Sequence, residues 1–163
     1  MARLRAGLVA PAALTVAAAV GWWSASEPAV YPATVIEVID GDTIVVRYDD
    51  GRTETVRILG VDTPETKHPT IGVECFGPQA AAHTSARLGG ARIGIQPDVE
   101  PFDDYGRRLA HVLIDGRSYG DELLRLGMAE VFALAPNDSR ARAQLAIELD
   151  ARARGAGLWS ACH

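Results

Sequence analysis

A first group of residues suited to chemistry is the segment Asp40-Gly41-Asp42-Thr43, which places two carboxylates around a glycine. Hard divalent cations such as Ca²⁺ bind several carboxylate and carbonyl oxygens together, and Asp42 adds such a ligand at the exit of the turn. A plain hairpin turn is the alternative reading, because Asp-Gly is a common turn pair that recurs at 50–51 and 115–116. The additional carboxylate makes Asp42 a candidate cation ligand.

A second polar group ends the next apolar stretch, as Asp62-Thr63-Pro64-Glu65. Arg57 lies inside that stretch, where a strand arginine usually faces solvent. The Thr-Pro step restricts the backbone and can hold the Thr63 carbonyl in one direction. Two acids three residues apart beside an arginine suit a metal ligand plus a general base.

The third group is the segment 103–108, which reads DDYGRR. A polar turn with exposed arginines is the simplest interpretation of this segment taken alone. Arginine is nevertheless well suited to anionic esters, because its guanidinium fork matches two phosphate oxygens.

The elements that must position these groups are mostly short strands. Val-, Ile- and Thr-rich runs separated by turn residues predict five strands, over 34–39, 43–48, 53–59, 92–96 and 109–114. A long loop over 62–77 precedes an Ala-rich helix predicted over 78–88, and a short helix is predicted over 119–126. Five strands with a helix between the third and fourth predict an α+β (mainly β) fold, a five-stranded OB-fold barrel with three helices.

The third helix is predicted to begin after Pro136, with Ser139 as its N-cap. Its apolar residues recur at i, i+4 spacing and predict one apolar face, formed by Ala141, Leu145, Leu149 and Ala153.

The composition is that of one globular domain: 163 residues, 48% hydrophobic and 23% charged. The formal net charge is −5 and the pI is near 5.3. This acidic balance argues against nucleic-acid binding, which depends largely on Lys and Arg. A chain that meets phosphate backbones would need a local source of attraction, such as a bound cation.

The first 26 residues have the layout of an export signal. Arg3 and Arg5 give a basic start, residues 6–23 carry no charge, and small side chains follow at 24–26. The sequence thus predicts a signal peptide or N-terminal anchor over 1–26, a functional domain over 27–163, and a secreted or cell-envelope-associated protein. A retained membrane anchor is the alternative, although Pro11 and many alanines weaken it.

The chain has two cysteines, Cys75 and Cys162. In a cytosolic protein both would be free thiols. In an exported chain, an even count favours a disulfide between them.

Taken together and in order, the motifs resemble the staphylococcal-nuclease family. The matching segments run from about Tyr31 to Trp159 and read IDGDT, VRILGVDTPETKHP, ECFGPQA, DDYGRRLA and GLW. The resemblance implies an OB-barrel nuclease that binds one Ca²⁺, acts as a monomer, and hydrolyses phosphodiester bonds of DNA and RNA to leave 3′-phosphate ends.

The resemblance also implies a role for each matching residue. Asp42, Asp62 and the main-chain oxygen of Thr63 would bind Ca²⁺, with Asp40 and Thr43 supporting them. Glu65 would act as general base. Arg57 and Arg107 would stabilise negative charge on the phosphate, and Tyr105 and Lys67 would contact the substrate. The chemistry agrees, because a cation and two guanidiniums can neutralise the charge that gathers on a phosphodiester under attack.

The chain departs from the family pattern at positions that hold the substrate. Lysine is expected where Asp104 stands, base-stacking tyrosines where Ala133 and Ala135 stand, and further lysines where Thr70 and Ile71 stand. We therefore expect a high KM, strong Ca²⁺ dependence and little base preference. A non-catalytic nuclease-like module that binds nucleic acid or protein is the alternative, but such modules generally lose these acids and arginines. An OB-type carbohydrate binder would need aromatic platforms, and only 6% of the chain is aromatic.

Overall fold

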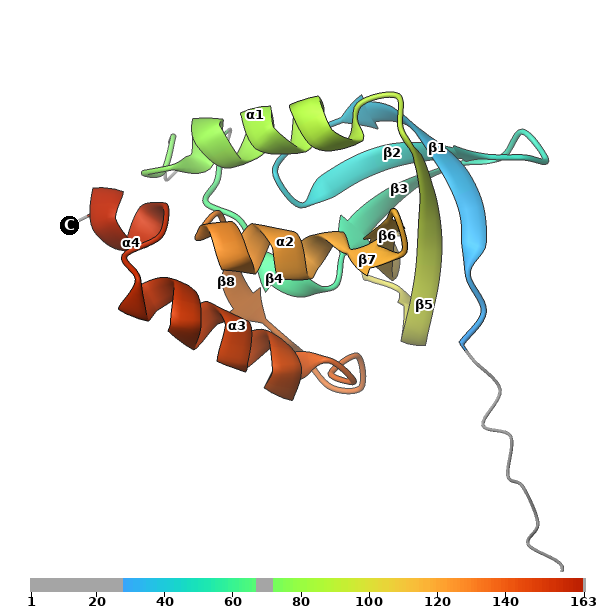
Figure 1. Cartoon of the computed structure of the whole chain (residues 1–163). Coiled ribbons are helices and arrows are strands. Elements are labelled where there is room, and N and C mark those ends of the chain that lie inside the picture. Colours follow the sequence, from blue (N-terminus) through green and yellow to red (C-terminus); the bar gives the residue numbers. More distant parts are fainter. Residues whose placement is uncertain (1–27, 67–71, 163) are drawn as a thin grey trace, which may run out of the picture.

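The computed structural model describes residues 28–66 and 72–162, which form a closed barrel of five strands with helices beside it (Figure 1). The barrel strands are β1 (Tyr31–Val38), β2 (Thr43–Tyr48), β3 (Thr53–Ile58), β5 (Arg92–Phe102) and β6 (Arg108–Ile114). They are hydrogen-bonded in the order β3-β2-β1-β5-β6, and a parallel pairing of β3 with β6 closes the barrel. The predicted five-stranded barrel is confirmed.

Alternating strand residues fill the barrel interior. Val35, Ile44, Val46, Val56 and Val112 are all almost completely buried, as expected where one face of each strand points into a core. In the pairing of β2 with β3, Thr43 lies opposite Arg57. The start of β2, directly after Asp42, therefore lies beside this candidate catalytic arginine.

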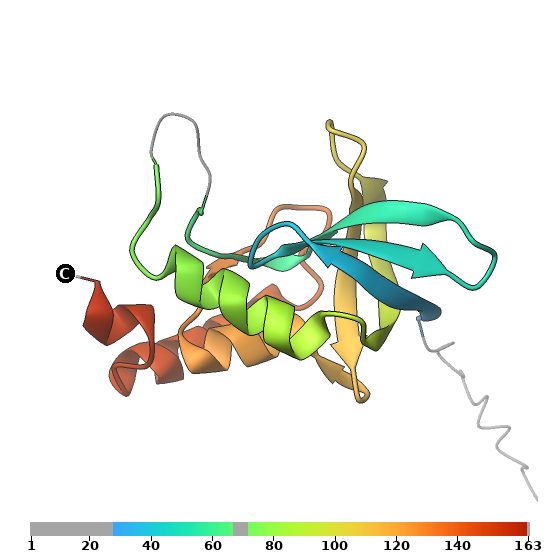
Figure 2. The same ribbon diagram turned by 90° about the horizontal axis from the view of Figure 1, so that it is seen from above.

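The helices gather at one side of the barrel (Figure 2). They are α1 (Gly77–Leu88), α2 (Tyr119–Leu126), α3 (Ala141–Ala153) and the single turn α4 (Leu158–Ala161). Helix α2 contacts both β6 and α3, so it lies between the barrel and the last long helix. All three predicted helices are present. Wherever a start or an end was predicted, the observed position differs from it by at most one residue.

Several elements were not predicted. A second, two-stranded sheet pairs β4 (Gly60–Asp62) with β8 (Glu130–Phe132), and a short strand β7 (Arg117–Ser118) pairs with β6. Strand β5 also continues six residues beyond its predicted end, with an irregularity in its pairing between Pro97 and Phe102. These short or irregular stretches carry too few residues for a clear alternation of apolar and polar side chains.

The prediction of Ser139 as the N-cap of α3 is wrong. The N-cap position is Arg140, without a side-chain cap bond, and the Ser139 hydroxyl instead donates to Asp98 Oδ2 at 2.7 Å. The face that carries Leu145 and Leu149 is exposed, at 47% and 56%, whereas Gln144, Glu148 and Ala151 are buried.

The structure joins Cys75 and Cys162 in a disulfide, which ties α4 to the start of α1. The predicted export segment and Lys67 lie outside the described residues. Among the helices that the structure describes, none has both the length and the apolar character needed to cross a membrane.

Candidate active site

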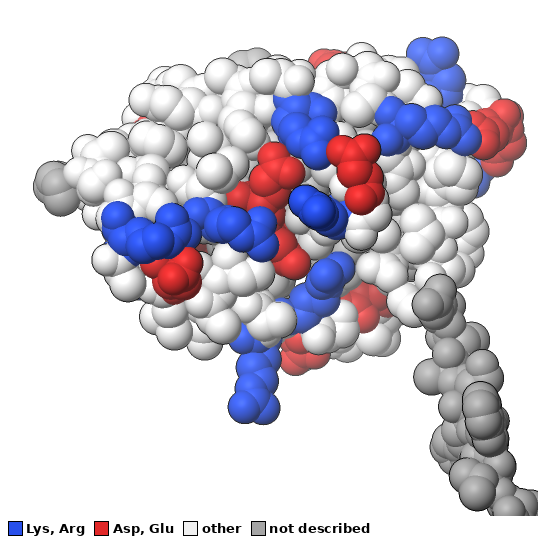
Figure 3. Space-filling view, in the orientation of Figure 1, with Lys and Arg blue, Asp and Glu red and all other residues white. Residues whose placement is uncertain are grey.

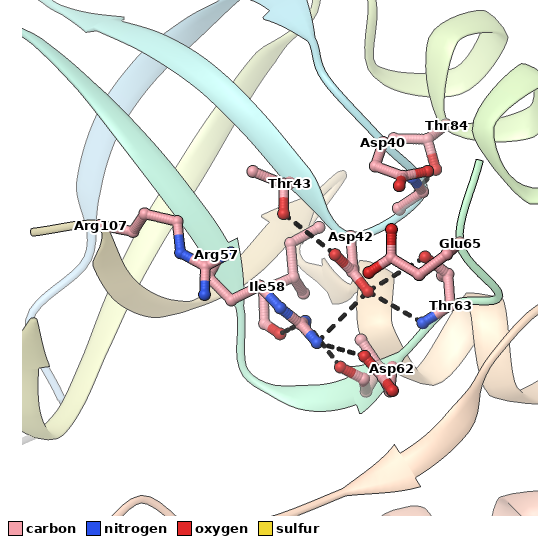
Figure 4. Close-up of polar contacts among 12 residues, drawn as sticks. Asp40, Asp42, Thr43, Arg57, Ile58, Asp62, Thr63, Glu65, Thr84 and Arg107 are labelled. Carbon is pink, nitrogen blue, oxygen red and sulfur yellow. Dashed lines mark hydrogen bonds and ion pairs between the residues drawn. The ribbon is translucent and has the colours of Figure 1, made fainter. Parts of the chain in front are cut away.

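Asp42 is the centre of a hydrogen-bonded polar cluster at one end of the barrel (Figure 4). Its side chain is nearly buried, and one carboxylate oxygen accepts from the Thr43 hydroxyl at 3.0 Å. The other oxygen accepts from the Thr63 main-chain N–H at 2.8 Å and the Thr63 hydroxyl at 3.0 Å. Asp42 therefore joins the β1–β2 turn to the segment that follows β4.

Arg57 extends from β3 into the same cluster. Its Nη1 donates to the carbonyl oxygens of Ile58, at 3.0 Å, and Val61, at 2.7 Å. Its Nη2 lies 2.6 Å from Asp62 Oδ1 and 3.3 Å from Asp42 Oδ2. The Arg57 side chain is only 13% exposed, so it does not take the solvated orientation that is usual for a strand arginine.

The two polar loops approach each other closely at Gly41, which has no side chain. A Cβ at Gly41 would lie 2.6 Å from the Thr63 hydroxyl oxygen, so a larger residue would push Thr63 away from Asp42. The Gly41 carbonyl accepts from the Thr84 hydroxyl of α1 at 2.7 Å, and Thr84 is itself within 2.8 Å of the buried Tyr119 hydroxyl. Helices α1 and α2 thus fix the turn that carries Asp42.

Glu65 points toward Asp42 from the segment after β4, with Asp40 nearby (Figure 4). Its main chain is held by Glu74, whose carboxylate accepts from the Glu65 N–H at 2.8 Å and whose N–H donates to the Glu65 carbonyl at 2.9 Å. Burial, followed by the charge of Asp40 and a hydrogen bond with it, raises the pKa of Glu65 above its usual value. The Glu65 carboxylate is therefore more basic than a typical glutamate, a property that suits a general base.

Arg107 follows the turn between β5 and β6. Its Nε donates to Asp103 Oδ2 at 2.6 Å and its main-chain N–H donates to Asp103 Oδ1 at 2.9 Å. Burial opposes ionisation of Asp103, but these hydrogen bonds from Arg107 outweigh it and lower the pKa of Asp103. The guanidinium also lies over the ring of Tyr105, which is 85% exposed.

Arg57 and Arg107 both line a pocket of about 310 Å³. Apolar residues form much of its wall, namely Ile58, Leu59, Phe102, Leu109, Phe132 and Leu134. Tyr105 is at the pocket, whereas Asp42, Asp62 and Glu65 lie beyond Arg57. The pocket thus places two guanidiniums next to an apolar wall. This arrangement suits a ligand in which an anionic group is attached to a flat apolar ring.

The oxygen atoms around Arg57 suit a hard divalent cation. Asp42 and Asp62 converge on one guanidinium nitrogen, so their carboxylates can surround a single positive charge. In the part of the chain that the structure describes, no three His, Cys, Asp or Glu side chains gather as a metal-binding group. The two carboxylates of Asp42 and Asp62 offer oxygen ligands only, which suit Ca²⁺ or Mg²⁺ with water or main-chain oxygens filling the remaining positions.

Sequence reasoning missed four residues of this region. Glu74 and Thr84 hold the candidate loops through the contacts described above. Glu130 and Phe132 come from β8, which pairs with β4 so that Glu130 lies opposite Asp62 and Phe132 opposite Gly60. The run Glu130-Val131-Phe132 is too short to show a strand period, so nothing in the local sequence signalled β8.

The charged side chains do not form a single basic surface. On the helical face shown in Figure 3, acidic and basic residues lie side by side. Many charged side chains are paired within the molecule, such as Arg87 with Asp115 and Arg140 with Asp121. This face therefore offers no continuous basic patch for an anionic ester.

The fold and this site define the class of this protein. It is a small OB-type barrel in which carboxylates suited to binding a cation and two arginines lie beside one pocket. A comparison with protein families places residues 55–161 in the family described as Staphylococcal nuclease homologue. The chain belongs to this family.

Individual relatives support the same grouping. The chain is 41% identical over 104 residues to the thermonuclease of Staphylococcus intermedius, which covers 64% of this chain and 61% of that protein. It is 36% identical over 129 residues to endonuclease YncB of Bacillus subtilis (strain 168), covering 78% of this chain and 61% of that protein. The SPbeta prophage-derived endonuclease YokF of the same organism is 35% identical over 129 residues, covering 78% of this chain and 43% of that protein. The matched region thus spans at most about three fifths of these relatives.

Proposed function

We propose that this protein is a Ca²⁺-dependent endonuclease that hydrolyses phosphodiester bonds of DNA and RNA and leaves 3′-phosphate ends. The observation that carries the proposal is the position of Arg57 Nη2, within 2.6 Å of Asp62 and 3.3 Å of Asp42. One guanidinium and two cation-binding carboxylates are thereby within reach of one phosphate group. The names of the relatives, thermonuclease and endonuclease, support the same activity.

The residues of the chain divide the work as follows. Arg57 and Arg107 bind the non-bridging oxygens of the phosphate and stabilise the charge that develops in the five-coordinate transition state. Glu65 accepts a proton from the attacking water as the new P–O bond forms and the P–O5′ bond breaks. Asp42, Asp62 and the Thr63 carbonyl would hold Ca²⁺, which would supply further positive charge at the phosphate.

The proposal includes export and a monomeric state. The signal-type pattern of residues 1–26 supports export, and a disulfide between Cys75 and Cys162 is typical of a protein that folds in an oxidising compartment. Nothing in the activity as proposed requires a second subunit.

The test is cleavage of single-stranded DNA and RNA by residues 27–163, with Ca²⁺, with Mg²⁺ and with chelator. We expect cleavage with Ca²⁺ that chelator abolishes, and products whose ends require phosphatase before a polymerase can extend them. Cleavage that persists in chelator would contradict the cation dependence. Binding of nucleic acid without any cleavage would instead identify the chain as a non-catalytic module.

Three variants test the residue roles. Arg57→Ala, Glu65→Ala and Arg107→Ala should each lower kcat by at least about a hundredfold while the protein stays folded, which is the usual effect of losing an acid–base or charge-stabilising group. Arg47→Ala, which removes an exposed arginine of β2, is the control and should change kcat by less than about twofold. Near-wild-type turnover in the three site variants would reject the assignment.

A further inference from the structure

The small sheet places a carboxylate directly opposite a candidate cation ligand. In the antiparallel pairing of β4 with β8, Asp62 is the partner of Glu130, and Gly60 is the partner of Phe132. Residues directly opposite each other on antiparallel strands project to the same face, with Cβ atoms about 4.5–5.5 Å apart. Glu130 and Asp62 therefore lie side by side on the face that also carries Phe132 of the pocket wall.

The charge of Glu130 is poorly compensated. Its only ion-pair partner in the described residues is Arg152, at 3.7 Å. That guanidinium also contacts the buried Glu148 at 2.8 Å and stacks on the Trp159 ring at 3.9 Å. Arg57 is the partner of Asp62, but it also faces Asp42. Arg152 is therefore shared between two carboxylates and compensates the charge of Glu130 only in part.

Two like charges directly opposite each other destabilise a strand pair. A divalent cation bound at Asp62 would relieve this repulsion, because it adds positive charge between the acids.

We propose that Glu130 acts through Asp62 as an additional determinant of cation affinity, so that β8 raises the affinity of the Asp42–Asp62 site for Ca²⁺ and couples Ca²⁺ binding to the stability of the small sheet. This inference rests on the cation site of the proposed function. It assigns Glu130 no contact with the reacting atoms, and its role is electrostatic and positional.

The experiment measures Ca²⁺ binding directly by isothermal calorimetry and by the rise of Tm on addition of Ca²⁺, in the absence of nucleic acid. Glu130→Gln should weaken Ca²⁺ binding by about three- to tenfold, which is the effect of removing one nearby charge at a solvated site. Its Tm should rise less on addition of Ca²⁺, because the rise depends on the ratio of cation concentration to Kd. At saturating Ca²⁺, kcat should stay within about twofold of wild type.

Two control variants separate the effect of the charge at position 130 from the effect of removing any carboxylate. Glu130→Asp keeps the charge on β8 and should restore most of the affinity. Glu37→Gln removes an exposed carboxylate of β1, without an ion pair among the described residues, and should leave Ca²⁺ binding unchanged. A merely structural role for Glu130 would lower Tm in Glu130→Gln without changing the Kd for Ca²⁺, and that outcome would overturn the inference.

The wild-type protein separates this inference from the proposed function. If wild type binds Ca²⁺ but cleaves no nucleic acid, the nuclease proposal fails and the Glu130 comparison still stands. If wild type cleaves nucleic acid and Glu130→Gln binds Ca²⁺ as tightly as wild type, the Glu130 inference fails alone. If wild type binds no Ca²⁺, the inference about Glu130 is overturned together with the Ca²⁺ site.

Discussion

The two ends of the pocket are held in very different ways. At the charged end, Arg57 and Arg107 line the pocket, and the carboxylates of Asp42, Asp62 and Glu65 lie just beyond Arg57. Both arginines are held there by hydrogen bonds or ion pairs of 3.3 Å or less, Arg57 to Val61, Asp62 and Asp42 and Arg107 to Asp103. At the apolar end, Phe102, Phe132 and Leu134 are 43%, 49% and 63% exposed and are positioned only by packing. Hydrogen bonds are directional and fix a group in one place, whereas apolar contacts tolerate several arrangements.

This difference suggests that the two ends of the pocket have different roles in catalysis and binding. The charged end is organised before substrate arrives, as stabilisation of a transition state requires. The apolar end offers surface for an unpaired base but few fixed contacts, so it should contribute to affinity more than to the chemical step. Changes at the charged end should lower kcat, and changes at the apolar end should raise KM.

The largest expected effect concerns the disulfide that anchors the charged end. Cys75 follows Glu74, whose two hydrogen bonds hold the main chain of Glu65. Replacing Cys75 and Cys162 with serine should lower the free energy of unfolding by about 4 kcal/mol, because the bond closes a loop over a separation of 87 residues. Urea unfolding of the wild type with and without reductant, beside the double variant, measures this loss.

The double serine variant also provides the control. A reductant should destabilise wild type to the level of the variant and leave the variant unchanged. Should reductant shift both proteins equally, the effect would not come from the disulfide. Below the unfolding temperature, we expect the variant to lose kcat rather than affinity, because Glu65 lies at the charged end.

A smaller effect is expected at the apolar end. Phe132→Ala should raise KM for single-stranded DNA by about five- to thirtyfold, corresponding to about 1–2 kcal/mol of lost base contact, with kcat within about twofold. Phe132→Tyr keeps the ring and should stay close to wild type. Steady-state kinetics on one oligonucleotide separates kcat from KM. A fall in kcat at unchanged KM would contradict the role of the apolar end in affinity.

The charged end could be predicted from sequence because its information is local. Asp42, Asp62 and Glu65 lie in two short segments whose glycine and proline residues set the backbone, and the adjoining strands alternate clearly enough to place them at one barrel end. Nothing local indicated the apolar end. Ala133 and Ala135 led us to expect little base stacking, whereas Phe132 lines the pocket because β8 pairs with β4, a contact between residues 70 positions apart.

Helix α3 shows a different limit of sequence reasoning. Its period of apolar residues is correct, but periodicity does not say which face meets the core. Tertiary contacts hold the polar face in the interior: Glu148 accepts from Arg152 at 2.8 Å, and Gln144 Nε2 donates to Asp121 Oδ1 at 3.4 Å. The Gln144 Oε1 has no hydrogen-bond partner among the described residues, and the amide packs against Gly60, where a Cβ would leave no room. A buried polar group costs little once it is paired, so a tertiary contact can reverse the usual preference.

The smallest expected effect tests this reversed helix, which belongs to neither end of the pocket. Leu145→Gln and Leu149→Gln should each change the free energy of unfolding by less than about 0.5 kcal/mol, because both side chains already face solvent. Glu148→Ala should cost more than about 1 kcal/mol, since it leaves a cavity and leaves Arg152 with only its 3.7 Å ion pair to Glu130. Thermal and urea unfolding of the three variants measure these differences. If instead the leucine variants were the destabilised ones, α3 would pack through its apolar face in solution, and Gln144 could no longer support Gly60 at the start of the strand that carries Asp62.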